Sequence, residues 1–194
     1  MSLIKNDLHK ILDEIRNKLR SLSSEEAKKA FAKFVPNSQQ VYGVRLPQIN
    51  QLAKEYSAHG FLLIEALWQS GAFEEKMLAV KVLNRTCRKD PDHTLKLLNL
   101  FKSYVDNWAI CDTLCSEGIR PILKTHSSEV FDLAKKYLDL DVMWIRRMGV
   151  VLLIHFAKIP ERKEEVRGLI QPLASDKEHY IKKAIVWINR YLDK

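Results

Sequence analysis

One short pattern occurs three times along the chain, as Lys76-Met77-Leu78-Ala79-Val80, Arg147-Met148-Gly149-Val150-Val151 and Lys183-Ala184-Ile185-Val186-Trp187. Each copy begins with a basic residue and continues with small or apolar residues, which is typical of a helix that packs against others. The second copy begins 71 residues after the first, and the third begins 36 residues after the second. A spacing of roughly 35 to 40 residues is typical of stacked helix pairs, so the repeat predicts an all-α, HEAT-like fold that forms a curved α-solenoid.

The remaining sequence also favours helices over strands. It contains no clean alternation of Val, Ile and Thr with polar residues, and no Asn-Gly or Asp-Gly hairpin signal. The pattern predicts helices over residues 3–20, 24–34, 46–58, 61–70, 73–88, 91–104, 107–123, 127–139, 141–158, 160–172 and 176–192. The one long stretch predicted to be non-helical is 35–45. No linker or low-complexity segment interrupts the helices, so we expect a single domain over residues 1–194.

Local signals mark several of the predicted helix starts. Ser23-Ser24-Glu25-Glu26 and Ser175-Asp176-Lys177-Glu178 each fit a capping box, in which a hydroxyl and a carboxylate satisfy the first backbone N–H groups. Asp90-Pro91 combines a capping carboxylate with a first-turn proline. We therefore expect helices to begin at these three places.

The composition is that of a globular protein rather than a secreted or membrane-spanning one. The chain has 194 residues, of which 46% are hydrophobic and 29% are charged. The first seven residues include no apolar core of a signal peptide, and the apolar run 150–154 ends at His155. The three cysteines lie in apolar helical segments, and Cys111 and Cys115 have no nearby partners to complete a metal site. We therefore expect a cytoplasmic monomer with reduced thiols, no metal and no cofactor.

The net charge of the chain indicates the kind of partner that it attracts. The formal net charge is +8, and residues 141–194 carry 11 Lys and Arg against 7 Asp and Glu. This segment holds half of the net positive charge in little more than a quarter of the chain. Such a balance attracts a polyanion, and a cytosolic protein can also be mildly basic for solubility alone.

Three predicted helices carry an aromatic ring and a charge on one face. Trp108 precedes Asp112 by four residues, Trp144 precedes Arg147 by three, and Lys183 precedes Trp187 by four. Residues three or four apart lie side by side on a helix. Together the pairs indicate a surface for a flat, charged ligand, for which DNA is the leading candidate.

The same residues carry a resemblance to a known family. The relevant segments, in chain order, are Val41-Tyr42-Gly43-Val44-Arg45-Leu46-Pro47, then Asn107-Trp108 with Asp112, then Trp144-Ile145-Arg146-Arg147, then Tyr180-Ile181-Lys182-Lys183-Ala184-Ile185-Val186-Trp187. In this order they resemble the DNA alkylation repair family, the AlkD-like HEAT-repeat DNA glycosylases. Two positions depart from the family pattern: Asn50 stands where many members have Arg or Lys, and Ala109 where an acidic residue is common.

The resemblance implies an enzyme that removes N3- and N7-alkylated purines from double-stranded DNA by hydrolysing the N-glycosidic bond, without a base-flipping pocket. By position, Asp112 would be the catalytic carboxylate, and Trp108 and Trp187 would hold the damaged nucleotide. Arg147 would contact the DNA backbone. The neighbouring basic residues Arg146, Lys182 and Lys183 are further candidates for phosphate contacts.

Each assignment has a simpler alternative. Trp108 and Trp144 could be packed core rings, Asp112 could pair with a basic residue of a neighbouring helix, and Arg147 could be a solvated surface charge. His155 lies between apolar residues and is expected to be a hydrogen-bonded core histidine. At the level of the whole protein, the alternatives to a glycosylase are a non-catalytic DNA-binding HEAT module and a scaffold that binds a peptide.

Overall fold

The computed structural model describes residues 2–35 and 40–194, and this part of the chain contains helices and no strand. The all-α prediction is therefore confirmed for the described residues. The chain divides into two compact units, Met1–Leu97 and Leu98–Lys194. The single domain expected from the sequence stays a prediction, because an array of stacked helices can contain several compact units within one domain.

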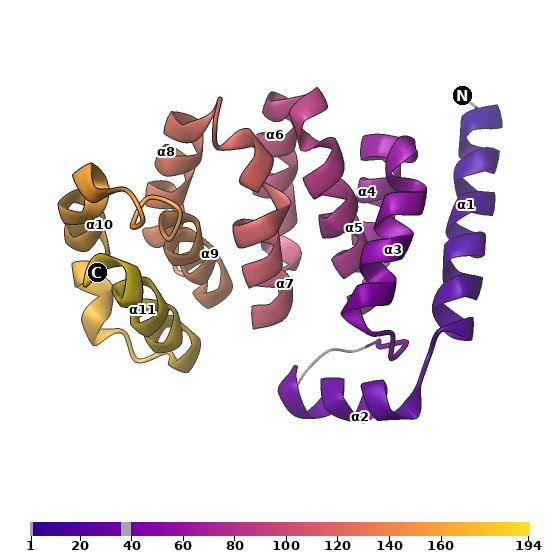
Figure 1. The fold of residues 1–194 in the computed structure, drawn as a ribbon, viewed down its shortest axis with the longest axis horizontal. Coiled ribbons are helices and arrows are strands. Elements are labelled where there is room, and N and C mark those ends of the chain that lie inside the picture. The colour runs from indigo at the N-terminus through magenta and orange to yellow at the C-terminus, as the bar shows by residue number, and fades with distance from the viewer. Residues whose placement is uncertain (1, 36–39) are drawn as a thin grey trace. The chain divides into compact units, whose positions relative to one another are not determined.

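Unit 1 is built from helices that begin and end close to their predicted bounds. They are α1 (Ser2–Ser21), α2 (Glu25–Phe34), α3 (Leu46–Tyr56), α4 (Gly60–Gln69), α5 (Phe73–Thr86) and most of α6 (Pro91–Phe101). Helix α5 packs against α3 and α4, and α4 packs against α1. Helix α2 runs across the direction of α1 and α3 (Figure 1).

Unit 2 contains α7 (Trp108–Thr113), α8 (Ser127–Leu138), α9 (Met143–Leu153), α10 (Lys163–Ile170) and α11 (His179–Leu192). Helix α9 packs against α7, α8 and α11. The contact with α8 is close, because a Cβ atom added at Gly149 would lie 2.8 Å from the Leu138 Cδ2 and 2.9 Å from the Ala134 carbonyl oxygen. Only glycine allows the two helices to approach this closely.

The first two copies of the repeated pattern mark the innermost helix of each unit. All five residues of 76–80 on α5 and all five of 147–151 on α9 are buried. The third copy, on α11, differs, since Ala184 is buried while Lys183 and Val186 are exposed. A helix that is covered on all sides needs apolar residues all round, which explains why the pattern is so apolar in the first two copies.

Two of the three predicted helix starts are confirmed. Ser24 caps α2 and accepts a hydrogen bond from the Ala27 N–H, and the Asp90 carboxylate accepts one from the His93 N–H. The capping box at 175–178 is wrong. There the Asp176 carboxylate accepts a hydrogen bond from the Glu178 N–H, and α11 begins only at His179. A short local turn has replaced the first turn of the expected helix.

The single helix predicted over 107–123 is also wrong in its second half. Helix α7 ends at Thr113 and continues as a π-helical turn, Leu114–Gly118, and then as the 3₁₀ turn Arg120–Ile122. π-helical turns occur often at functional sites. Of the stretch predicted to be non-helical, 40–45 is confirmed as irregular and 36–39 lies outside the described residues.

None of the helices in the part of the chain that the structure describes combines the length and the apolar composition that crossing a bilayer requires.

Candidate functional site

The candidate site in unit 2 begins with the cap of α7. The buried Asn107 side chain accepts a hydrogen bond of 3.0 Å from the Ile110 N–H and donates one of 2.7 Å to the Asp106 carboxylate. This cap fixes Trp108 as the first residue of the helix. The Trp108 ring is half-buried, and Asp112 follows it one helical turn later. The predicted pairing of ring and carboxylate on one helix is therefore present.

The carboxylate of Asp112 is held by Arg147 from α9. The Arg147 Nε donates to Asp112 Oδ1 at 2.9 Å, and Nη2 donates to Oδ2 at 2.8 Å. The side chain of Asp112 is 17% exposed and that of Arg147 is 6% exposed. This bidentate geometry is the strongest form of ion pair between side chains, and it fixes the carboxylate in one orientation.

Arg147 also reaches α11. Its Nη1 donates to the backbone carbonyl of Tyr180, and the Tyr180 ring packs on Trp144 with the ring centroids 4.8 Å apart. The Cys111 thiol of α7 donates to the Trp144 carbonyl with a sulfur–oxygen distance of 3.9 Å. Helices α7, α9 and α11 are thus tied together around one buried guanidinium.

The two charges of the pair influence each other's pKa. Burial raises the pKa of Asp112 above its usual value, and the hydrogen bonds and positive charge of Arg147 oppose this rise. Burial by itself would lower the pKa of Arg147, but the hydrogen bonds and charge of Asp112 more than compensate and raise it. The guanidinium therefore remains charged, and its charge and hydrogen bonds limit the rise in the pKa of Asp112.

The other predicted DNA-binding residues lie on the same helices in different environments. Arg146 contacts Asp141 at 3.1 Å and Asp176 at 3.3 Å, so its charge is balanced within unit 2. Lys182 and Lys183 are exposed on α11, and in the part of the chain that the structure describes neither forms an ion pair. Trp187 is half-buried on α11, one turn beyond Lys183. The structure brings Asp112 and Arg147 into direct contact, whereas Lys182, Lys183 and Trp187 share a helix with Tyr180.

Sequence reasoning missed two features of this site. It allowed Arg147 to be a solvated surface charge, which is wrong because the side chain is buried. It also missed the carbonyl of Tyr180 as the third acceptor for this guanidinium. One signal could have revealed the burial, since Arg147 opens an apolar run and a buried arginine requires an acidic partner. The acceptor role of a backbone carbonyl leaves no signal in the sequence.

His155 behaves as expected for a core histidine. Its Nε2 donates to the Cys115 carbonyl at 2.9 Å, and burial lowers the pKa of the ring. Cys87, Cys111 and Cys115 are buried free thiols. Within residues 2–35 and 40–194, no group of three or more His, Cys, Asp and Glu side chains is arranged to hold a metal ion.

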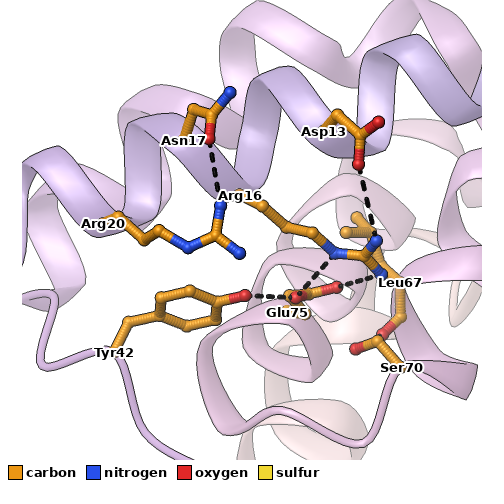
Figure 2. Close-up of polar contacts among 8 residues, drawn as sticks. All are labelled: Asp13, Arg16, Asn17, Arg20, Tyr42, Leu67, Ser70 and Glu75. Carbon is orange, nitrogen blue, oxygen red and sulfur yellow. Dashed lines mark hydrogen bonds and ion pairs between the residues drawn. The ribbon is translucent and has the colours of Figure 1, made fainter.

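Unit 1 contains a second cluster of polar side chains, which the sequence did not reveal. Figure 2 shows the Glu75 carboxylate between the Tyr42 hydroxyl and the Arg16 guanidinium, which also faces Asp13. Tyr42 donates to Glu75 Oε1 at 2.7 Å, and Arg16 Nε donates to the same oxygen at 3.3 Å. Burial and this hydrogen bond raise the pKa of Tyr42 to about 12. The tyrosine therefore stays protonated and acts as a donor.

Glu74, the neighbour of Glu75, fastens the loop before α3. Its carboxylate accepts hydrogen bonds from the backbone N–H groups of Tyr42 at 2.9 Å, Gly43 at 2.7 Å and Val44 at 3.1 Å. Its side chain is completely buried. A carboxylate with three backbone donors and no exposure has a structural role. These contacts hold the backbone of residues 42–44 in place, and the positive φ of 84° at Gly43 explains why a glycine occurs there.

The profile of a family described as DNA alkylation repair enzyme matches residues 15–192. No curated protein matched the chain in a separate sequence search. The matched range covers most of both units and every predicted site residue, and it confirms the resemblance that the sequence motifs indicated. The chain belongs to the DNA alkylation repair enzyme family.

Proposed function

We propose that the protein is a monofunctional DNA glycosylase that releases cationic N3- and N7-alkylated purines from double-stranded DNA. The observation that carries this proposal is the Asp112 carboxylate. It is fixed by two hydrogen bonds, remains partly exposed, and lies one helical turn from a half-buried tryptophan. The family to which the chain belongs supports a role in alkylation repair.

The reaction requires a negative charge at this kind of position. Alkylation at N3 or N7 gives the purine a positive charge, so the bond between C1′ and the base nitrogen breaks with its electron pair moving to the base. The base leaves neutral, and positive charge grows on the sugar. Water then adds to C1′ and loses a proton, which leaves an abasic site. A carboxylate about 4 Å from the sugar, at an effective dielectric constant of about 20, stabilises that charge by about 4 kcal/mol.

The aromatic residues fit the same substrate. Indole faces attract cations, and each such contact contributes roughly 0.5 to 2 kcal/mol. Trp108 and Trp187, both half-buried, are the rings we assign to the cationic nucleotide. An undamaged purine is neutral and gains less from these contacts, so the charge of the lesion provides selectivity. We further propose that the helix pairs stack as HEAT-like repeats in a curved solenoid along which duplex DNA lies.

An excision assay tests the proposal. The purified protein is incubated with methylated duplex DNA, and we expect release of free 7-methylguanine or 3-methyladenine. We expect Asp112→Asn to slow release by on the order of 10²-fold or more while leaving DNA affinity largely intact. Asp132→Asn is the matched control, because Asp132 is an exposed aspartate on α8 that pairs only with Lys135 in the described structure.

The assay also separates the alternatives. The same Asp112–Arg147 pair would suit a non-catalytic DNA-binding module, in which the pair serves only to join helices. That reading predicts binding of duplex DNA without release of any alkylated base. Activity that is equal in the wild type and Asp112→Asn would remove Asp112 from the mechanism without removing the glycosylase.

A further inference from the structure

Three of the five N–H donors of the Arg147 guanidinium are used inside the fold. Nε and Nη2 are used by the two oxygens of Asp112, and Nη1 is used by the Tyr180 carbonyl. The side chain is 6% exposed. Phosphates of duplex DNA are large, hydrated and anchored to a stiff backbone, so they bind side chains at the surface of a protein. An arginine used in this way is poorly placed to act as a phosphate contact.

Two other cations are better placed for that role. Lys182 and Lys183 follow Tyr180 in the first turns of α11, they are exposed, and they form no ion pair within the described part of the chain. Arg146 is less suitable, because Asp141 and Asp176 already balance its charge. The charge of Arg147 therefore lies inside the fold, whereas the charges of Lys182 and Lys183 face the solvent.

We propose that Arg147 is a positioning residue, which orients the Asp112 carboxylate from inside the fold, and that Lys182 and Lys183 make the phosphate contacts. The proposal rests on the proposed function for the catalytic role of Asp112. The structural argument is the planar fork of arginine, whose two parallel hydrogen bonds fix both carboxylate oxygens at once. A lysine in the same place supplies a charge but only one point of attachment.

The charge of Asp112 depends on few neighbours. Arg147 faces it from α9, and the thiols of Cys111 and Cys115 lie in its own segment. From α11 the described contact is the Tyr180 carbonyl, which is neutral and binds Arg147. Removal of the guanidinium therefore takes away the one positive charge paired with Asp112, and the pKa of Asp112 rises.

The first experiment is the conservative variant Arg147→Lys in the excision assay. A phosphate contact requires only a positive charge, so under that reading the variant keeps most of its activity. If Arg147 positions Asp112, we expect the rate to fall by on the order of 10²-fold, as for a misplaced catalytic group. Arg190→Lys is the matched control, because it makes the same exchange at an exposed position of α11 outside the proposed site, and its rate should change less than about threefold.

The second experiment measures the salt dependence of affinity for an undamaged duplex. Each phosphate contact contributes about 0.9 to the slope of log K against log salt concentration. We expect Lys182→Met and Lys183→Met each to reduce the slope by about 0.9, and Arg147→Met to leave it unchanged. A reduction of about 0.9 in Arg147→Met together with an unchanged rate in Arg147→Lys would overturn the proposal.

The third measurement does not depend on activity. The pKa of Asp112 is followed by carboxyl-carbon NMR in the free wild-type protein and in Arg147→Met, which removes the positive charge, and the spectra also report whether the variant is folded. We expect a higher pKa for Asp112 in the variant, and an unchanged pKa would contradict the positioning role. If neither the wild type nor any variant releases a base, the proposed glycosylase function is wrong. The NMR titration and the salt dependence of DNA affinity still decide the role of Arg147 in that case.

Discussion

The two units contain buried carboxylates that are satisfied in different ways. In unit 1, Glu74 accepts three backbone N–H groups and is fully buried, and Glu75 is 2% exposed. In unit 2, Asp112 is bound by a single partner, Arg147, and its side chain is 17% exposed. The difference separates a carboxylate that holds a loop from one that is fixed in place and still accessible. Burial alone does not identify a functional acid, because a ligand can reach a carboxylate only through the part of its side chain that is still exposed.

The largest expected effect on stability is that of Glu74→Ala. Removal of this carboxylate leaves the N–H groups of Tyr42, Gly43 and Val44 without their acceptor in a buried place. Buried donors without a partner cost about 1 to 3 kcal/mol each, and partial access of water reduces the total, so we expect a loss of about 4 kcal/mol. Denaturant unfolding measures it, with Glu161→Ala as an exposed control that should stay within about 0.5 kcal/mol. If the free energy of unfolding fell by less than about 1 kcal/mol, Glu74 would not have the structural role that distinguishes it from Asp112.

A smaller effect is expected for Gly43→Ala in the same loop. Gly43 has φ of 84°, and an added Cβ would lie 2.4 Å from the Lys28 Cγ and 2.8 Å from the Ser24 carbonyl oxygen. The lysine can move, but the backbone oxygen cannot move easily. The left-handed conformation adds roughly 1 kcal/mol, so we expect a loss of about 2 kcal/mol in thermal or denaturant unfolding. Gly168→Ala is the control, because a Cβ there meets nothing within 4 Å, and it should not destabilise the protein.

The smallest effect on stability is expected for Asp112→Asn, although its effect on the proposed reaction is large. The amide keeps one oxygen for Arg147, and the guanidinium keeps the Tyr180 carbonyl. One charge-assisted hydrogen bond at a partly exposed site corresponds to about 1.5 kcal/mol. Urea unfolding at neutral pH checks this value. If the variant were as unstable as Glu74→Ala, Asp112 would belong with the structural carboxylates, and a slower reaction could then reflect unfolding.

The sequence predicted the helices well where periodicity and caps agreed. Ser24 and Asp90 cap the helices as expected, because both side chains reach the first backbone N–H groups from positions fixed by local geometry. The prediction failed at 175–178, where the Asp176 side chain satisfies the Glu178 N–H within a turn. The same residues can form the first turn of a helix or a short local turn. The structure has the local turn, and an ion pair between Asp176 and Arg146 accompanies it.

The candidate site was predictable in part. The spacing of Trp108 and Asp112 on one helix follows from the sequence, and so does the family, whose profile matches residues 15–192. The alternative that Asp112 pairs with a basic residue of a neighbouring helix is confirmed, but the sequence did not identify Arg147 as that residue, because residues 35 positions apart meet only through the packing of α7 on α9. The cluster of Glu74, Glu75 and Tyr42 had no signal for the same reason.

The sequence by itself determined that this protein is helical, basic and a member of a DNA repair family, because these properties depend on periodicity, composition and motifs that are local in the chain. Only the tertiary structure decided which charges face inward. Arg147 is buried and Lys183 is exposed, although each begins a copy of the same repeated pattern. The two copies differ because α9 is covered by neighbouring helices on all sides, whereas α11 has one face in solvent. A buried guanidinium requires partners, and Asp112 and the Tyr180 carbonyl supply them.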